Sequence, residues 1–296
     1  MTEIRNDEVT RRVVVGVDRS ENAAGAARWA AQEALSRGAP LTVVHAVHPP
    51  RISATTPDSA RRTRENGGRL LERIAADLRT DFPKLRVDVE LSDLPAARAL
   101  HTLSLESAVV VTGTRGHGGF AGMLLGSVSR KLAAHTHSPL VVVPGYGFEF
   151  ERVLNKVVLG VEAGQEQSAI RYAFAAAQRY GAVLHAVRAW PPDTASSTPM
   201  NTRLAEIARI RGDEREAVEG LLAPFRSSFP DVKVKISAVR GSPVPVLIEE
   251  AWDSRLLVVG AHHRHGALSV GAGHVIEMLL ARSPTPVAVV PEAHHG

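Results

Sequence analysis

The sequence has no cysteine and few aromatic residues, and these absences exclude several kinds of site. Without cysteine, the 296-residue chain forms neither disulfides nor thiolate metal sites, which suits a reducing compartment. Phe, Trp and Tyr together make up only 4% of the residues, which does not favour base-stacking nucleic-acid binding. The formal net charge is +4 and no long run of Lys and Arg occurs, so no nucleic-acid partner is expected.

Long apolar stretches are also missing. No run approaches the ~20 apolar residues of a membrane-spanning helix, and residues 1–8 lack the apolar centre of a signal peptide. With 44% hydrophobic residues, the chain can still bury a sizeable core. We therefore expect a cytoplasmic protein of one or two domains that has no membrane partner.

Short runs rich in β-branched residues recur through the first half of the sequence. They predict strands over residues 12–18, 41–47, 86–91, 109–113 and 140–143. Residues 49–62 are polar and contain prolines, so they are predicted to form a loop.

Helical segments separate these strands. The first begins after Ser20, a predicted N-cap, and stops at Gly38. The second carries an apolar stripe over residues 70–78, the third spans 96–104, and the last follows Ser127. Five strands that alternate with four helices are typical of a parallel α/β sheet.

The same pattern recurs in the second half of the sequence. Gly160 mirrors Gly16 at an offset of 144 (160 − 16), and Gly260 mirrors Gly113 at an offset of 147 (260 − 113). On the second strand, residues 184–187 are aligned with residues 44–47, at an offset of 140 (184 − 44). The chain is therefore predicted to be a tandem repeat.

A glycine-flanked junction follows the predicted strand 109–113. The strand ends at Gly113, Gly116 comes three residues later, and after nine further residues Gly126 and Ser127 begin a helix. Glycine lets a ligand approach main-chain N–H groups, and the first turn of a helix adds unpaired donors and the positive end of its dipole. The junction is predicted to bind an anion, most simply a phosphate, although it is neither the GxxxxGK[ST] loop nor the GxGxxG fingerprint.

This combination resembles the universal stress protein family in its tandem two-domain form. The resemblance rests on the spacing of Gly113, Gly116, Gly126 and Ser127, together with residues 16–18, 45–46 and 138–144. It implies two Rossmann-like domains of the adenine nucleotide alpha hydrolase type, residues 1–148 and 149–296. Each has a five-stranded parallel sheet of order 3-2-1-4-5 with helices on both faces, and a crevice between strands one and four. Members of this motif class bind ATP, here expected with or without Mg²⁺.

The resemblance also assigns the nucleotide site of the first domain. Asp18 and the backbone of Ala46 are expected at the adenosine end, and the start of the helix at the phosphates. The implied cofactor-binding residues are Gly16, Val17, Asp18, Ala46, Gly113, Arg115, Gly116, Gly126, Ser127, Val128 and Ser129. No catalytic residue and no metal ligand is predicted.

The second repeat departs from this motif. The corresponding residues are Glu162 for Asp18, Gly260 for Gly113, His262 for Arg115, His263 for Gly116, Gly273 for Gly126, His274 for Ser127 and Glu277 for Arg130. We expect this repeat to bind ATP weakly or not at all; the alternative is a remodelled site for another anion or nucleotide. The spacing of its histidines matches no standard metal-ligand set, and a solvated loop is expected there.

Four functions are compatible with these observations. The favoured one is an ATP-binding regulator of the stress response with little or no hydrolysis. The others are a slow ATPase, a binder of another adenine nucleotide such as cyclic AMP, and a structural pseudodimer. Hydrolysis is disfavoured because no carboxylate pair lies near the predicted phosphate site.

Assembly and packing can also be predicted. The apolar edge strands 140–143 and 287–290 are expected to pair within the chain, and whole chains are expected to form homodimers. The three tryptophans, Trp29, Trp190 and Trp252, are predicted to be packing residues. Two histidines inside strands, His45 and His185, are predicted to be hydrogen-bonded structural residues.

Overall fold

The structure is a computed structural model that describes residues 11–47, 56–114, 125–145, 155–162, 167–191, 200–261 and 273–292. The chain divides into two compact units, Met1–Val143 and Pro144–Gly296. The predicted boundary between residues 148 and 149 lies outside the described residues. Among the helices of the described segments, none combines the length and the apolar character that crossing a membrane requires.

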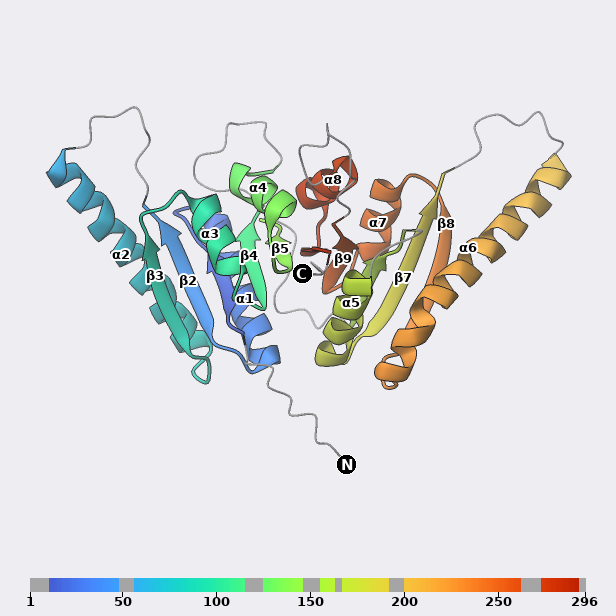
Figure 1. Ribbon diagram of the computed structural model, residues 1–296, viewed down its shortest axis with the longest axis horizontal. Helices are drawn as coiled ribbons and strands as arrows, with labels where there is room; N and C mark the ends of the chain where they lie inside the picture. Colours follow the sequence, from blue (N-terminus) through green and yellow to red (C-terminus); the bar gives the residue numbers. More distant parts are fainter. Residues whose placement is uncertain are drawn as a thin grey trace. The chain divides into compact units, whose positions relative to one another are not determined.

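The first unit is a parallel sheet with helices on both faces (Figure 1). The strands have the order β3-β2-β1-β4-β5, and every described pairing is parallel. The helices α1 and α2 contact each other, as do α3 and α4, so each pair forms one layer. The elements are β1 (Val13–Gly16), α1 (Glu21–Arg37), β2 (Leu41–Ala46), α2 (Pro57–Asp81), β3 (Val87–Ser92), α3 (Ala96–Ser104), β4 (Val109–Gly113), α4 (Ser127–His135) and β5 (Leu140–Val143).

The second unit repeats this architecture. Its strand order, β8-β7-β6-β9-β10, is again 3-2-1-4-5 when the strands are numbered within the unit. The predicted fold class is therefore confirmed for both units. The elements are β6 (Lys156–Gly160), α5 (Gln167–Tyr180), β7 (Val183–Trp190), α6 (Met200–Ser228), β8 (Val234–Arg240), α7 (Pro243–Ala251), β9 (Leu256–Gly260), α8 (His274–Arg282) and β10 (Val287–Val290).

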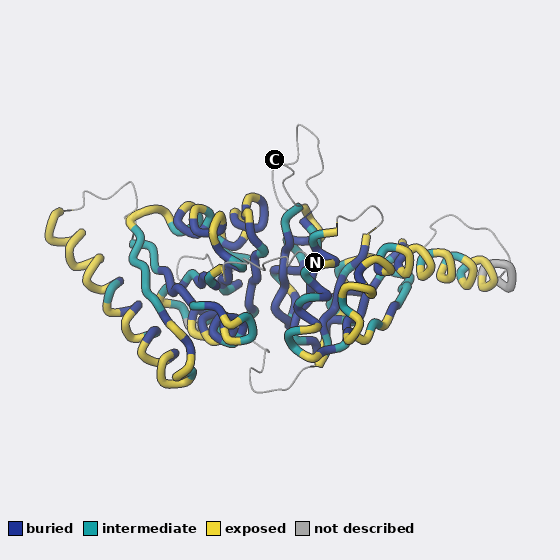
Figure 2. The backbone as a smooth tube through the Cα atoms, turned by 60° about the horizontal axis from the view of Figure 1, so that its bottom comes forward, coloured by how far each residue is buried: buried dark blue, intermediate teal, exposed yellow. Residues whose placement is uncertain are grey.

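The central strands are buried along most of their length, shown in dark blue in Figure 2. Val13, Val14 and Val15 of β1 have no exposed surface, and neither do Val157, Val158 and Leu159 of β6. Both faces of each sheet are covered by helices, so a strand needs an unbroken apolar run rather than alternation. This explains why short runs of Val and Leu predicted the strands so closely.

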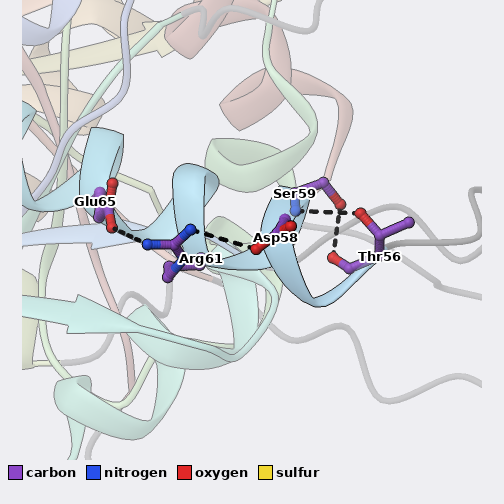
Figure 3. Close-up of polar contacts among 5 residues, drawn as sticks. All are labelled: Thr56, Asp58, Ser59, Arg61 and Glu65. Carbon is purple, nitrogen blue, oxygen red and sulfur yellow. Dashed lines mark hydrogen bonds and ion pairs between the residues drawn. The ribbon is translucent and has the colours of Figure 1, made fainter.

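The start of α2 corrects the predicted loop over residues 49–62. The helix begins at Pro57, and Thr56 caps it: the backbone N–H of Ser59 donates to Thr56 Oγ1 at 3.3 Å (Figure 3). Arg61 lies 3.3 Å from Asp58 and 3.8 Å from Glu65, on the exposed surface of the helix. The polar composition hid this helix because its first ten residues are exposed, so no apolar stripe marks them.

The register of the second strand corrects the predicted repeat alignment. Gly16 pairs with Val44 in the first unit, and Gly160 pairs with Val187 in the second. The offset on this strand is therefore 143 (187 − 44) and not 140. His45 corresponds to Arg188, and His185 has no histidine counterpart. The sequence favoured the wrong alignment because the tripeptide His-Ala-Val occurs in both strands, at residues 45–47 and 185–187, but at different register positions.

Two adjacent glycines of α2 give a matched test of packing in the first unit. A Cβ on Gly67 would lie 2.6 Å from Val47 Cγ1, 2.9 Å from Leu91 Cδ1 and 3.1 Å from His45 Cδ2, whereas one on Gly68 has no neighbour within 4 Å. We expect Gly67→Ala to lower the free energy of unfolding by about 1–3 kcal/mol. Gly68→Ala should raise it by about 0.5–1 kcal/mol. Urea unfolding of the two variants measures both changes, and shifts in the same direction would contradict this packing.

Candidate functional site

The candidate site lies where the strand order of the first unit reverses. β1 is flanked by β2 and β4, and the helices that follow β1 and β4 lie on opposite faces of the sheet. In such sheets, ligands bind in the crevice outside the carboxyl ends of these two strands. Gly16, Val17 and Asp18 lie at the end of β1, and Gly113 lies at the end of β4.

The predicted adenosine end is held by local hydrogen bonds. Ser20 donates to Asp18 Oδ1 from its backbone N–H at 2.9 Å and from its hydroxyl at 2.5 Å. Ser20 is the N-cap residue of α1 as predicted, although its side chain makes no cap hydrogen bond to the helix. The Nδ1–H of His45 donates to the carbonyl of Val17 at 2.8 Å, so His45 is a hydrogen-bonded structural histidine as predicted.

Gly16 has a structural reason to be glycine. A Cβ at this position would lie 2.6 Å from Leu100 Cδ1 of α3. The second unit repeats the arrangement, with Leu247 Cδ1 3.1 Å from a Cβ on Gly160. The bare Cα of Gly16 therefore allows α3 to pack on the strand end, whether or not a ligand is bound.

Strand β4 and helix α4 are joined directly at their facing ends. The N–H of Gly126 donates to the carbonyl of Thr114 at 2.7 Å, which brings the two ends of the intervening segment together. The hydroxyl of Ser129 donates to the carbonyl of Gly113 at 2.9 Å and lies 3.1 Å from Thr112 Oγ1. Thr112 and Ser129 are both buried, so this pair ties the first turn of α4 to the end of β4.

The start of α4 has the features of an anion site. Gly126 is its N-cap residue, no side chain caps it, and its first turn contains no acidic residue. Ser127 is exposed at the first helical position, and Arg130 and Lys131 are exposed in the same helix. Unpaired N–H groups, a hydroxyl and two cations at the positive end of a helix dipole together favour a bound anion.

Gly126 adopts a backbone conformation that does not require glycine. Its φ of −68° and ψ of 151° are allowed for any residue. Its backbone angles therefore do not account for the glycine, and a bare Cα at a helix start is a place where a ligand can approach the main chain.

The equivalent glycine of the second unit is different. Gly273 has a φ of 85° and a ψ of 145°, a combination that side-chain-bearing residues rarely adopt. The first turn of α8 also carries an acid, Glu277. The two glycines are aligned in the sequence but are retained for different physical reasons, and the second helix start is electrostatically less suited to an anion.

The polar tie between β4 and α4 is also absent from the second unit. At the offset of 147, Val259 (259 − 112) and Ile276 (276 − 129) replace Thr112 and Ser129. Both replacements are buried apolar side chains, so the strand end and the helix start are joined without side-chain hydrogen bonds at these two positions. The pair was not predicted because Thr112 directly follows a run of three valines. The signal in the sequence was the exchange of two polar residues in the first repeat for two apolar residues in the second.

An ion pair stands at the equivalent of the adenosine end in the second unit. Arg188, which replaces His45, has its Nε 2.8 Å from Glu214 Oε2 and its Nη1 3.5 Å from the carbonyl of Val161. Glu214 itself stands at the position of Gly67 (214 − 147). In the first unit, Gly67 packs against the imidazole of His45. In the second unit, two long charged side chains, Glu214 and Arg188, take these two positions.

For the remaining predicted site residues, the structure gives only their position and burial, or does not describe them. Ala46 ends β2 and is half-buried, and Val128 lies half-buried in the first turn of α4. Arg115, Gly116, His262 and His263 fall outside the described residues. Among the residues that are described, no three His, Asp or Glu side chains gather as metal ligands would.

Comparison with known proteins identifies the family to which this sequence is similar. The family model described as the universal stress protein family matches the sequence twice, over residues 10–144 and 154–291. A universal stress protein of Mycolicibacterium smegmatis is 31% identical over 286 residues, which cover 94% of this chain and 96% of that protein. One of Mycobacterium tuberculosis is 30% identical over 292 residues, which cover 95% and 96%.

Solved structures agree with the fold. The crystal structure of a universal stress protein from Archaeoglobus fulgidus matches with a TM-score of 0.71 at 16% identity, covering 97% of this chain and 98% of that one. A protein of unknown function from Pseudomonas aeruginosa matches with a TM-score of 0.61 at 16% identity, covering 95% and 92%. At these identities the likeness concerns the fold alone.

Proposed function

The chain belongs to the universal stress protein family, and from this premise we propose that its first unit binds ATP at the carboxyl ends of β1 and β4. The observation that carries the proposal is Gly126: a bare Cα, in a conformation open to any residue, at the start of an uncapped helix without acids. Asp18 and the backbone of Ala46 take the adenosine end. The N–H of Gly126 is bonded to Thr114, so the main-chain N–H groups of Ser127 and Val128 and the hydroxyl of Ser127 take the phosphates, beside the bare Cα of Gly126.

Ser129 has a different part in this proposal from the one first predicted. Its hydroxyl is already bonded to Gly113 and Thr112, and its side chain is buried. It therefore positions the helix start against the strand end, and its backbone N–H is what it offers to a phosphate. Mg²⁺, where present, would accompany the phosphates of ATP and not a cluster of protein carboxylates.

The bound nucleotide acts as a regulatory ligand in this proposal. No aspartate or glutamate occurs between Glu106 and Glu149, so the whole segment around the phosphates lacks a carboxylate base. We expect hydrolysis to be slow for this reason. Occupancy by ATP then shifts the protein between states that differ in nucleotide affinity, and a partner of the stress response recognises one of them.

Two measurements on the full chain test this function. The nucleotide released by denaturing the purified protein is identified by mass spectrometry, and we expect ATP. Single-turnover assays with and without Mg²⁺ should show far slower hydrolysis than release. Cyclic AMP as the retained nucleotide, or turnover faster than release, would replace the proposal with one of its two alternatives, a cyclic-nucleotide binder or an ATPase.

The second unit is proposed to bind ATP weakly or not at all. The acid in the first turn of α8, the glycine-specific backbone of Gly273 and the Arg188–Glu214 ion pair each support this. Glu162 adds a methylene at the position of Asp18.

A further inference from the structure

Trp190 and Arg240 are neighbours at the carboxyl ends of β7 and β8. They are paired in register across the two strands, and the guanidinium carbon of Arg240 lies 5.8 Å from the centre of the Trp190 ring. Trp190 is 4% exposed. Both side chains lie on the face of the sheet covered by α6, because Arg188, two residues before Trp190, contacts Glu214 of that helix.

Each of these side chains has a buried donor without an acceptor. Among the residues that the structure describes, neither Trp190 Nε1 nor Arg240 Nε finds a hydrogen-bond partner, and both atoms are buried. Buried donors are almost always satisfied, so two orphaned donors on adjacent residues need an explanation. Glu214 does not supply it, because Arg188 engages its carboxylate at 2.8 Å.

The first unit shows what the second has lost at this place. The residues that correspond to Trp190 and Arg240 are Val47 (190 − 143) and Asp93 (240 − 147). There, Arg64 of α2 forms an ion pair with Asp93. The counterpart of Arg64 in α6 is Arg211 (64 + 147), so the second unit has arginine at both positions of that pair.

We propose that an oxyanion, a carboxylate or phosphate oxygen of a ligand, binds at Trp190 and Arg240 and takes the place of the missing acid. The indole N–H and the guanidinium Nε–H donate to it, and the charge of Arg240 strengthens both contacts. Arg211 is exposed on α6 and adds a second positive charge for a larger ligand. This site is separate from the nucleotide site of the first unit and does not depend on it.

The indole N–H resonance of Trp190 tests the proposal directly. The three indole signals of the ¹⁵N-labelled full chain are assigned with Trp190→Phe, and the protein is titrated with inorganic phosphate and, separately, with acetate. Sodium chloride keeps the ionic strength constant. We expect the Trp190 proton to move downfield and saturate, while the signals of Trp29 and Trp252 stay in place.

Variants of Arg240 supply the controls. Arg240→Leu should raise the anion concentration at the midpoint of the titration about tenfold or more. Arg226→Leu, which removes an exposed cation elsewhere on α6, should leave this midpoint concentration unchanged. Arg240→Asp restores the acid of the first unit and should abolish the shift even if the leucine variant is poorly folded. A response to phosphate alone, to acetate alone or to both identifies the anion. No saturable shift with either, or an unchanged midpoint in Arg240→Leu, overturns the proposal.

Discussion

Replacing Gly126 with alanine is expected to weaken ATP binding by about tenfold to a hundredfold without lowering the thermal unfolding temperature. The backbone angles of Gly126 suit alanine, so the substitution introduces no backbone strain. The new methyl group lies where the proposed phosphate approaches the helix start. The loss of one charge-assisted hydrogen bond, worth about 1.5–3 kcal/mol, gives the expected factor.

Gly273 provides the matched control in the same chain. Alanine at a φ of 85° is strained, so Gly273→Ala should lower the free energy of unfolding of the second unit by about 1–3 kcal/mol. ATP affinity should be unchanged. Calorimetric titration and thermal unfolding of both variants measure the two effects. Equal ATP affinity in the parent and the Gly126 variant would remove the physical basis of the nucleotide site.

The second large effect concerns His185, which lies buried in the second unit. It is 2% exposed, its Nε2 is 2.9 Å from Ser237 Oγ, and its Nδ1 is 3.6 Å from Glu250 Oε2. Burial, together with the positive charges of Lys235 and Lys156, lowers the pKa of His185 to about 4 from its usual 6.5. Desolvation is the largest of these causes, because burial penalises the charged imidazolium.

This depressed pKa makes the stability of the second unit depend on pH. The unfolded chain binds a proton at His185 near pH 6.5, whereas the folded protein does so only near pH 4. The contribution of His185 to the free energy of unfolding is therefore fully present above pH 6.5. It is lost as the pH drops toward 4, by about 3 kcal/mol in all. About 2 kcal/mol of this loss should be complete at pH 5. Burial also lowers the pKa of Lys156, but its usual value of 10.5 keeps it outside this window.

The non-titrating variant His185→Gln isolates this contribution. Between pH 7 and 5, the free energy of unfolding of the parent should fall more steeply than that of the variant. Urea unfolding at several pH values measures both slopes, and the carboxylates that the two proteins share cancel in the difference. Superimposable slopes would show that His185 does not carry the pH dependence.

Much of the fold was predictable because each unit is built from buried parallel strands. Runs such as 109–111 and 140–143 are continuously apolar, and the structure confirms the strand order of both sheets. The start of α2 was not predictable in the same way, because an exposed helix stabilised by a cap and local ion pairs leaves no hydrophobic pattern.

Single side chains were harder to predict than elements. Trp29 and Trp190 are buried as predicted, but Trp252 is 62% exposed, so its prediction as a packing residue is wrong. It follows the last residue of α7, and its carbonyl, rather than its ring, is engaged, by Lys156 Nζ at 2.8 Å. Large size alone does not bury a residue at a helix end.

The candidate site was predictable as a place but not in its detail. The spacing of Gly113 and Gly126 located the junction of β4 and α4. The sequence does not show that the hydroxyl of Ser129 bonds Gly113 and Thr112. It also does not show that Gly126 and Gly273 differ in φ, because both features depend on backbone geometry.

The number of ATP molecules bound per chain tests the central claim most directly. Isothermal titration calorimetry of the full chain with ATP should give one site, since only the first unit combines an acid-free helix start with a glycine that its backbone does not require. Two equivalent sites per chain, or no measurable binding, would contradict the account.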